Sequence, residues 1–188
     1  MREIARETIE LAAGGDIAAF EDIYKAFSST VYTVALGVTR NAQDAEEAAQ
    51  DVFVKVYRNL KDFRFGSSFG TWVYRITMNT AINIYRSKAR HRAFGMADYA
   101  EVKDNIPDPH DTTKEEVERH HTAESVDRIL DKMSPEHRLC ITLREIEGLD
   151  YKEMAGILRI PLNTVRSRLK RARAAMAACA KEGLDHGL

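Results

Sequence analysis

The stretch LDYKEMAGILRIPLNTVRSRLKRAR, residues 149–173, decides the fold. Asp150 can cap a first helix, and Glu153 follows three residues later, as in a capping box. Pro161 has no amide hydrogen to donate, so this helix ends there and a second begins near Leu162. Two helices joined by so short a break predict a helix-turn-helix.

The second of these helices combines an apolar stripe with a basic face. Its apolar residues recur at spacings typical of one helical side: Leu162, Val165, Leu169, Ala172 and Met176. Short polar side chains in its first turns can reach DNA base edges, while later basic side chains can contact phosphates. The predicted duplex contacts are Asn163, Thr164, Arg166, Ser167, Arg168, Lys170 and Arg171. A solvated basic face without DNA binding is the alternative interpretation.

The amino-acid composition indicates the broad class of protein. The chain has 188 residues, a hydrophobic fraction of 44% and a net charge of −1. It contains no apolar run of about 18 residues and no apolar segment near its start, so we expect a cytoplasmic protein without membrane insertion. The two cysteines and six histidines show no ligand spacing, so no metal or cofactor is expected.

Charge is segregated along the chain and suggests its domain organisation. Residues 93–120 hold eight acidic against three basic residues, with two prolines and no periodic apolar face. This acidic linker separates a predicted domain at residues 1–92 from a second at residues 121–188. Each domain contains a basic segment without acids, at 75–92 and 159–173. Two basic segments predict two nucleic-acid contacts on one chain.

The N-terminal domain begins with periodic helices. A short helix is expected over residues 2–13, followed by one that Asp16 caps and that continues to about residue 40. A third helix, DAEEAAQDVFVKVYRNL, is expected to open at Asp44 and to run to residue 60. Its early acidic residues suit the helix dipole, and a docking face for another protein is the functional interpretation.

Residues 61–92 place aromatic rings beside a Gly/Ser loop and a basic helix. Single-stranded DNA requires rings on which bases stack and basic side chains that follow the backbone. Core packing of the aromatic residues is the alternative, and the two roles need not exclude each other. One side of the helix after the loop is expected to present Arg75, Asn79, Asn83, Arg86 and Arg90.

The C-terminal domain is also expected to be helical. Ser134 followed by Pro135 is a strong start signal for a helix. That helix is expected to bury Leu143 and Ile146 and to close at Gly148.

These blocks together resemble the bacterial group IV, or extracytoplasmic-function (ECF), sigma factors of the sigma-70 family. The resemblance rests on the 44–60 helix, FRFGSSFGTWVYRITMNTAINIYR, the acidic linker and SPEHRLCITLREIEGLDYKEMAGILRIPLNTVRSRLKRAR, in that order. It implies an all-α fold with two small helical domains, a sigma-2 helical bundle and a four-helix sigma-4 domain with the helix-turn-helix, joined by a flexible linker.

The resemblance also implies site residues. Sigma-2 would dock on the clamp helices of core RNA polymerase through Asp44, Glu47, Gln50, Asp51, Phe53, Val54 and Lys55. It would recognise and melt the minus-10 element through Phe65, Ser67, Ser68, Phe69 and Trp72, together with Arg75, Asn79, Asn83, Arg86 and Arg90. Sigma-4 would approach the polymerase flap and read the minus-35 element with the seven residues named above.

The implied activity is promoter-specific transcription initiation, with core polymerase and promoter DNA as partners. The resemblance also implies an anti-sigma factor that can hold the protein at the inner membrane. Pro161 departs from the polar cap expected before a recognition helix, so the start of that helix stays open by a residue or two. No nucleophile–base set or phosphate-binding loop is present, so neither an enzyme nor a small-molecule substrate is expected.

Two other functions stay open. The first is a conventional helix-turn-helix regulator that binds duplex DNA without polymerase. The basic stripe at 75–90 argues against it, because a sensor domain has no use for such a stripe. The second is an RNA-binding or anti-termination module, which would prefer single strands without depending on polymerase.

Overall fold

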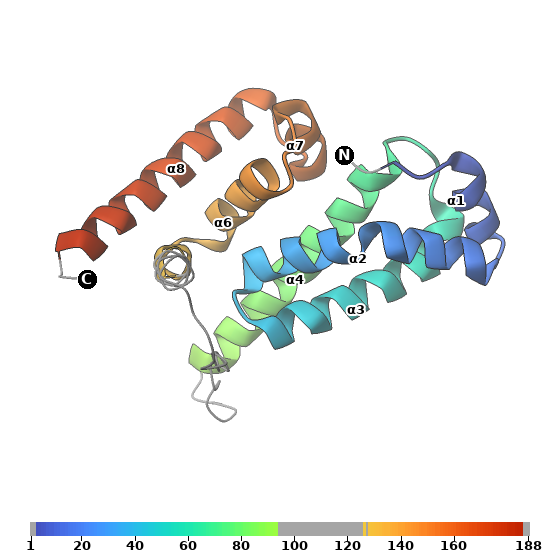
Figure 1. Ribbon diagram of the computed structural model, residues 1–188, viewed down its shortest axis with the longest axis horizontal. Coiled ribbons are helices and arrows are strands. Elements are labelled where there is room, and N and C mark those ends of the chain that lie inside the picture. Colours follow the sequence, from blue (N-terminus) through green and yellow to red (C-terminus); the bar gives the residue numbers. More distant parts are fainter. Residues whose placement is uncertain (1–2, 94–125, 127, 186–188) are drawn as a thin grey trace, which may run out of the picture.

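The computed structural model describes residues 3–93, 126 and 128–185, and within them every regular element is helical (Figure 1). In order, the elements are α1 (Arg6–Ala13), α2 (Ile17–Thr39), α3 (Ala42–Asn59), η1 (Leu60–Asp62), α4 (Phe69–Ala93), α6 (Pro135–Ile141), η2 (Thr142–Ile146), α7 (Tyr151–Leu158) and α8 (Leu162–Asp185). The all-α prediction is confirmed. The linker predicted at 93–120 lies outside the described residues, except for Ala93 at the end of α4.

Local sequence signals set the helix boundaries in the N-terminal unit. The Asp16 side chain accepts a hydrogen bond of 2.9 Å from the Ala19 amide and so caps α2, as predicted. The third helix opens earlier than predicted, because Asn41 rather than Asp44 is its cap. Asn41 Oδ1 accepts a hydrogen bond of 2.8 Å from the Asp44 amide, which places Asp44 inside the first turn of α3.

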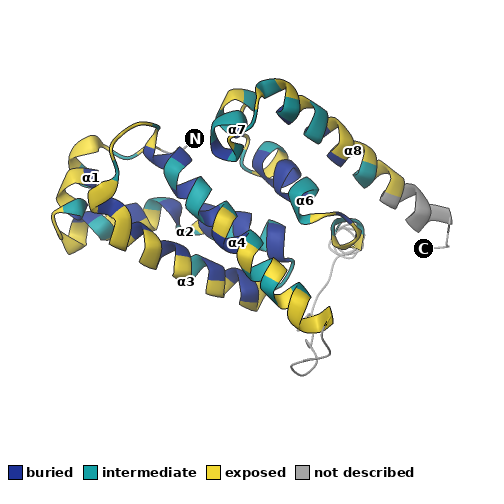
Figure 2. Ribbon diagram, turned by 180° about the vertical axis from the view of Figure 1, so that it is seen from behind, coloured by how far each residue is buried: buried dark blue, intermediate teal, exposed yellow. Residues whose placement is uncertain are grey.

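Helices α2, α3 and α4 pack around one apolar core. The buried members include Ile23, Phe27, Val31, Val52, Val56 and Val73, and α1 adds Ile9 and Ala12 at one end. Figure 2 shows these buried faces turned inward and the exposed residues on the outer surfaces of α1 and α3. Burial of this surface is what holds the three long helices together.

The C-terminal unit follows the predicted order of signals. Ser134 caps α6 with Pro135 in its first turn. The capping box of Asp150 and Glu153 is present at the start of α7. Arg159 ends α7 in the left-handed conformation at φ 53°, and α8 begins at Leu162, so the predicted helix-turn-helix boundaries are confirmed.

One part of this unit was predicted incorrectly. The helix from Pro135 does not keep a regular period to Gly148, because η2 is a single π-helical turn. A wider turn rotates the following residues away from a 3.6-residue stripe. Ile146 is consequently 63% exposed, although its spacing predicted a core position, whereas Leu143 is fully buried.

The two units pack against each other (Figures 1 and 2). Helix α6 lies on α2, and α7 lies on α4. One hydrophobic cluster runs through both units and includes Val34, Val38 and Tyr74 as well as Leu139, Met154 and Val165. Within the described residues, no helix is both long and apolar enough to cross a membrane.

Candidate nucleic-acid interface

An aromatic cluster surrounds the loop before α4. The Phe63 ring lies 4.8 Å from Phe65, 5.4 Å from Phe69 and 5.2 Å from Trp72, measured between centroids. Phe69 is buried and also packs on Phe27, so its role is largely structural. Phe65 is 37% exposed, with a positive φ of 55° that is uncommon for a bulky residue. Among the predicted ring contacts, Phe65 is the one best placed for a base.

The serines of this loop fix the start of α4. Ser68 Oγ accepts a hydrogen bond of 3.1 Å from the Thr71 amide, and the Ser68 carbonyl accepts one of 3.2 Å from the Trp72 amide. Ser67 Oγ donates to the Ser68 carbonyl at 3.3 Å. Both serines thus have local structural roles, and their predicted contact with DNA stays a prediction.

Arg6 is a candidate contact that the sequence did not indicate. Its guanidinium carbon lies 4.4 Å from the Phe65 ring centroid, in a cation–π arrangement. Arg6 Nε donates to Glu10 Oε1 at 2.7 Å, which orients the group. No local pattern connects residue 6 to residue 65, because only the packing of α1 brings them together.

The polar stripe of α4 lies on one side of the helix, as expected. Asn79, Asn83 and Arg90 are exposed. Arg75 instead donates two hydrogen bonds, of 3.1 and 2.7 Å, to the Gly156 carbonyl of α7. Burial lowers the pKa of Arg75 below its usual value, with a smaller effect from Arg159. Arg86 forms an ion pair of 3.4 Å with Glu136. The C-terminal unit therefore occupies two residues of the stripe.

Helix α8 presents the predicted basic face. Val165, Leu169 and Ala172 are buried against the rest of the unit, which turns the opposite side outward. Arg166 Nη1 donates to Asn163 Oδ1 at 3.1 Å, so these two polar groups lie side by side at the start of the helix. The other predicted contacts range from exposed to half-buried: Thr164, Ser167, Arg168, Lys170 and Arg171.

The α3 face divides into exposed and buried residues. Asp44 is 5% exposed and Phe53 is 8% exposed, so neither is open to a large partner surface. The Asp44 carboxylate forms an ion pair of 3.0 Å with Lys88 of α4, and the Phe53 ring packs 4.6 Å from Tyr24. The other predicted docking residues are exposed on α3: Glu47, Gln50, Asp51, Val54 and Lys55.

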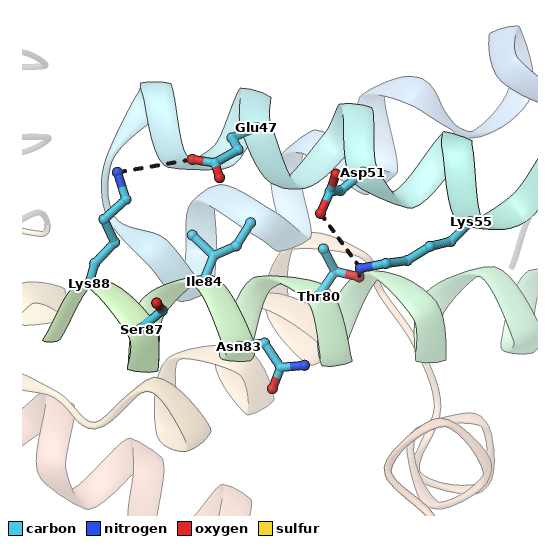
Figure 3. A pocket seen from close by; sticks show the side chains of 8 residues that line it. All are labelled: Glu47, Asp51, Lys55, Thr80, Asn83, Ile84, Ser87 and Lys88. Atoms are coloured by element: carbon cyan, nitrogen blue, oxygen red, sulfur yellow. Dashed lines mark hydrogen bonds and ion pairs between the residues drawn. The ribbon is translucent and has the colours of Figure 1, made fainter. Parts of the chain in front are cut away.

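Two depressions flank this exposed face. One, of about 470 Å³, lies between α2 and α3 and is lined by Tyr24, Ser28, Ser29, Tyr32, Glu46, Ala49, Gln50 and Phe53. The other, of about 260 Å³, lies between α3 and α4, where Figure 3 shows Glu47 directed at Lys88 and Asp51 at Lys55. Tyr24 and Tyr57 are 49% and 53% exposed. These two tyrosines extend the exposed face in a way that the sequence did not indicate.

A metal site finds no support in the described ranges. No group of three or more His, Cys, Asp or Glu side chains there is placed to hold an ion. Cys140 is buried, and this burial raises the pKa of its thiol, as suits a reduced core residue.

Comparison with known proteins agrees with this arrangement. The family model described as Sigma-70 region 2 matches residues 23–91, and Sigma-70, region 4 matches residues 123–176. The RNA polymerase sigma-H factor of Pseudomonas aeruginosa is 31% identical over 185 residues, covering 93% of each chain. The ECF RNA polymerase sigma-E factor of Escherichia coli K12 is 36% identical over 141 residues, covering 71% of this chain and 72% of that protein.

Two solved structures share the fold. CnrH in complex with the cytosolic domain of CnrY has a TM-score of 0.66 at 23% identity, covering 97% of this chain and 98% of CnrH. The sigma factor RpoE in complex with the anti-sigma factor NepR from Bartonella quintana has a TM-score of 0.68 at 20% identity, covering 88% and 98%. With its two sigma-70 regions, its helical units and its full-length similarity to named sigma factors, this chain belongs to the ECF group of the sigma-70 family.

Proposed function

We propose that the protein is an alternative, ECF-type RNA polymerase sigma factor, which binds core polymerase and directs promoter-specific initiation. The observation that carries this proposal is the presence of two different nucleic-acid surfaces on one chain. The α4 stripe with the 63–69 loop suits an open strand, and the basic face of α8 suits duplex DNA. Residues 1–92 act as the sigma-2 domain, 93–120 as the linker and 121–188 as the sigma-4 domain.

Strand opening depends on the free-energy cost of unstacking bases and on the similar free energy gained when a base stacks on an aromatic side chain. Unstacking a base step costs a few kcal/mol. Stacking a base on an aromatic side chain returns about 1–3 kcal/mol. Phe65 supplies such a ring, and Asn79 and Asn83 supply polar groups about three and four turns after the start of α4. Because the balance is close, opening depends on the promoter sequence and on the polymerase holding both domains in place.

Polymerase docking belongs to the exposed α3 face. Glu47, Gln50 and Asp51 give this face its acidic and polar character, and Val54 adds an apolar contact. The adjoining depression with Tyr24 and Tyr32 offers a partly apolar seat for a helix of the polymerase clamp. Asp44 supports the face from inside, whereas Phe53, although only 8% exposed, is among the residues that line this depression.

The protein acts in the cytoplasm at the nucleoid and catalyses no reaction of its own. An anti-sigma factor is the proposed regulatory partner, and it would keep the protein at the inner membrane until a signal releases it.

Run-off transcription on a genomic fragment library tests the function. We expect new transcripts only when both core polymerase and this protein are present, and their start sites should share two spaced upstream elements. No new starts, together with tight duplex binding by the protein alone, would instead identify a conventional regulator.

A further inference from the structure

The depression between α3 and α4 joins the proposed polymerase-docking face to the polar stripe of α4. Its volume is about 260 Å³, and Figure 3 shows side chains entering it from both helices. Helix α3 contributes three of the exposed docking residues, and α4 contributes Asn83 of the stripe with four neighbours. The lining residues are Glu47, Asp51, Lys55, Thr80, Asn83, Ile84, Ser87 and Lys88. One depression therefore borders both the proposed protein-binding surface and the proposed DNA-binding surface.

The ammonium group of Lys88 is held at one end of the depression by two carboxylates of α3. Its Nζ atom lies 3.0 Å from Asp44 Oδ1 and 3.9 Å from Glu47 Oε2. The Asp44 side chain is buried, whereas those of Glu47 and Lys88 are about half exposed. The buried carboxylate fixes the position of Lys88, and the exposed carboxylate lies where a partner can reach it.

A second ammonium group, that of Lys55, lies at the other end (Figure 3). Its Nζ atom lies 3.6 Å from Asp51 Oδ2 and donates a hydrogen bond of 2.9 Å to Thr80 Oγ1. Among the residues that the structure describes at this depression, three carboxylates thus accompany two ammonium groups. The net charge is negative, so the free chain repels a phosphate group from this place.

Docking of polymerase would reverse this charge balance. The exposed docking face carries the acidic residues Glu47 and Asp51, so charge complementarity favours basic groups on the polymerase side. Those groups would neutralise both exposed carboxylates and leave two ammonium groups against Asp44 alone. The depression would then be positive beside Asn83 and Ser87, whose amide and hydroxyl groups are donors that suit phosphate oxygens.

We propose that this depression binds a backbone phosphate of the minus-10 strand through Lys88, Asn83 and Ser87. Polymerase docking activates the site by neutralising Glu47 and Asp51. The proposal rests on the proposed function, since it takes α3 as the docking face and α4 as the strand contact. It adds Lys88 to the promoter contacts and makes strand binding depend on polymerase. Because coupling between two sites is reciprocal, the bound strand should also strengthen polymerase docking.

Glu47→Gln with Asp51→Asn imitates the neutralised state in the free, full-length chain. Both positions are exposed and both replacements keep the side-chain shape, so the fold should persist. A labelled oligothymidine of about twelve nucleotides is the probe, because phosphate contact does not depend on the bases. Its affinity should rise about tenfold, within the usual range of coupling between sites. The slope of log K against log salt should steepen by about 0.7, as for one added phosphate contact on a single strand.

A matched double variant controls for net charge. Glu21→Gln with Asp22→Asn removes the same two charges from exposed positions of α2. Glu21 pairs with Lys25 at 2.6 Å, so this variant also deprives a lysine of its carboxylate partner, as Asp51→Asn does. The affinity for oligothymidine should rise by no more than about twofold, since neither residue lines the depression and salt screens distant charges.

Variants of Lys88 distinguish the phosphate site from a general effect of charge. Added to Glu47→Gln with Asp51→Asn, Lys88→Gln should abolish the tenfold gain and Lys88→Arg should preserve it. Lys88→Gln also takes this partner from the buried Asp44 carboxylate, so a second variant is needed in case the fold is weakened. Ser87→Asp places a carboxylate in the depression while the ion pair between Asp44 and Lys88 stays, and it should likewise abolish the gain.

The complex with core polymerase gives a readout that a purely structural lysine would not change. In the otherwise unmodified chain, Lys88→Gln should alter the strand affinity of the free protein by less than about twofold and lower that of the complex about tenfold. Equal losses in both states would show that Lys88 acts only on the fold.

The outcomes separate this proposal from the proposed function. A gain no larger than that of Glu21→Gln with Asp22→Asn would overturn the phosphate site, as would a gain that survives both Lys88→Gln and Ser87→Asp. Failure of the unmodified chain to start transcripts with core polymerase would instead overturn the proposed function, and the oligothymidine titrations of the free chain do not depend on that result.

Discussion

The guanidinium group of Arg6 lies over the ring of Phe65, with 4.4 Å between the guanidinium carbon and the ring centroid. This contact joins α1, which precedes the residues matched to sigma-70 region 2, to the loop proposed to capture a base. Arginine planes stack on aromatic rings and on nucleic-acid bases alike. Arg6 and Phe65 can therefore form one extended stacking surface.

Phe65→Ala should weaken binding of a minus-10 single strand by about 1–3 kcal/mol, because a base loses its stacking partner. Arg6→Ala should cause a smaller loss, of about 0.5–1 kcal/mol, as is typical for exposed cation–π contacts. Fluorescence anisotropy with a labelled oligonucleotide measures both changes. Arg64→Ala is the control, since Arg64 is an exposed arginine in the same loop. If Arg6→Ala and Arg64→Ala lose the same binding free energy, the effect of Arg6 would come from its net charge and not from its contact with Phe65.

Replacing Asn79 and Asn83 with alanine should impair promoter opening while leaving core polymerase binding intact. Both amides are exposed on α4, and the proposed docking residues lie on α3. Permanganate reactivity of thymines in the minus-10 element reports opening, and co-migration on gel filtration reports binding. Normal permanganate reactivity in the double variant would show that these two residues do not take part in promoter opening.

Local signals in the sequence were sufficient for most helix boundaries. The Asp150–Glu153 capping box, the Asp16 cap and the break at Pro161 each involve residues within a few positions of one another. Such contacts form in the chain segment itself, so a pattern can predict them. The polar side of α4, with Asn79, Asn83 and Arg90 exposed, and the basic face of α8 followed from the helical period for the same reason.

Features that depend on distant residues were not predictable in this way. Asn41 and Asp44 are both good caps, and packing decides between them because Asp44 pairs with Lys88 of another helix. Arg75 had the sequence context of a DNA contact, but its acceptor Gly156 is 81 positions away. The exposure of Ile146 arises from a π-helical turn, which a period of 3.6 residues cannot represent.

Replacing Arg166 and Lys170 with alanine should reduce both the affinity for minus-35 duplex and its salt dependence. If each side chain neutralises one phosphate, the slope of log K against log salt should fall by about 1.8. Arg173→Ala should change the slope less, because Arg173 is held by Glu145 in an ion pair of 2.7 Å. Titrations at several salt concentrations measure the slope. An unchanged slope in the double variant would contradict phosphate contact by this face.

The capping box of α7 should give the C-terminal domain an acid-sensitive component of stability. The Glu153 amide, hydrogen-bonded to Asp150, holds the pKa of that carboxyl below its usual value. A lowered pKa stabilises the folded state above the unfolded value, and this stabilisation is lost as pH falls through the folded value. Asp150→Asn should therefore lower the thermal midpoint at pH 7, and the difference should shrink below about pH 4. A difference that stays constant down to pH 3 would exclude the carboxylate charge as its source.

Alanine variants of Asp44 and Glu47 should distinguish residues of α3 that stabilise the fold from residues that bind polymerase. Asp44 is buried and bound to Lys88, so Asp44→Ala should lower the free energy of unfolding by about 1–3 kcal/mol, as expected when a buried polar partner is lost. Glu47 is exposed, and its nearest contact with Lys88 is 3.9 Å, so Glu47→Ala should leave stability within about 0.5 kcal/mol.

Binding to core polymerase should follow the opposite order. Glu47→Ala should weaken it, because the carboxylate is available on the docking face, whereas folded Asp44→Ala should bind almost normally. Urea unfolding measures stability, and competition with a labelled sigma factor for core polymerase measures binding. If Asp44→Ala abolishes polymerase binding at temperatures where the variant remains folded, the docking surface must include the buried edge of α3. Asp44 would then be a polymerase contact and not only a structural residue.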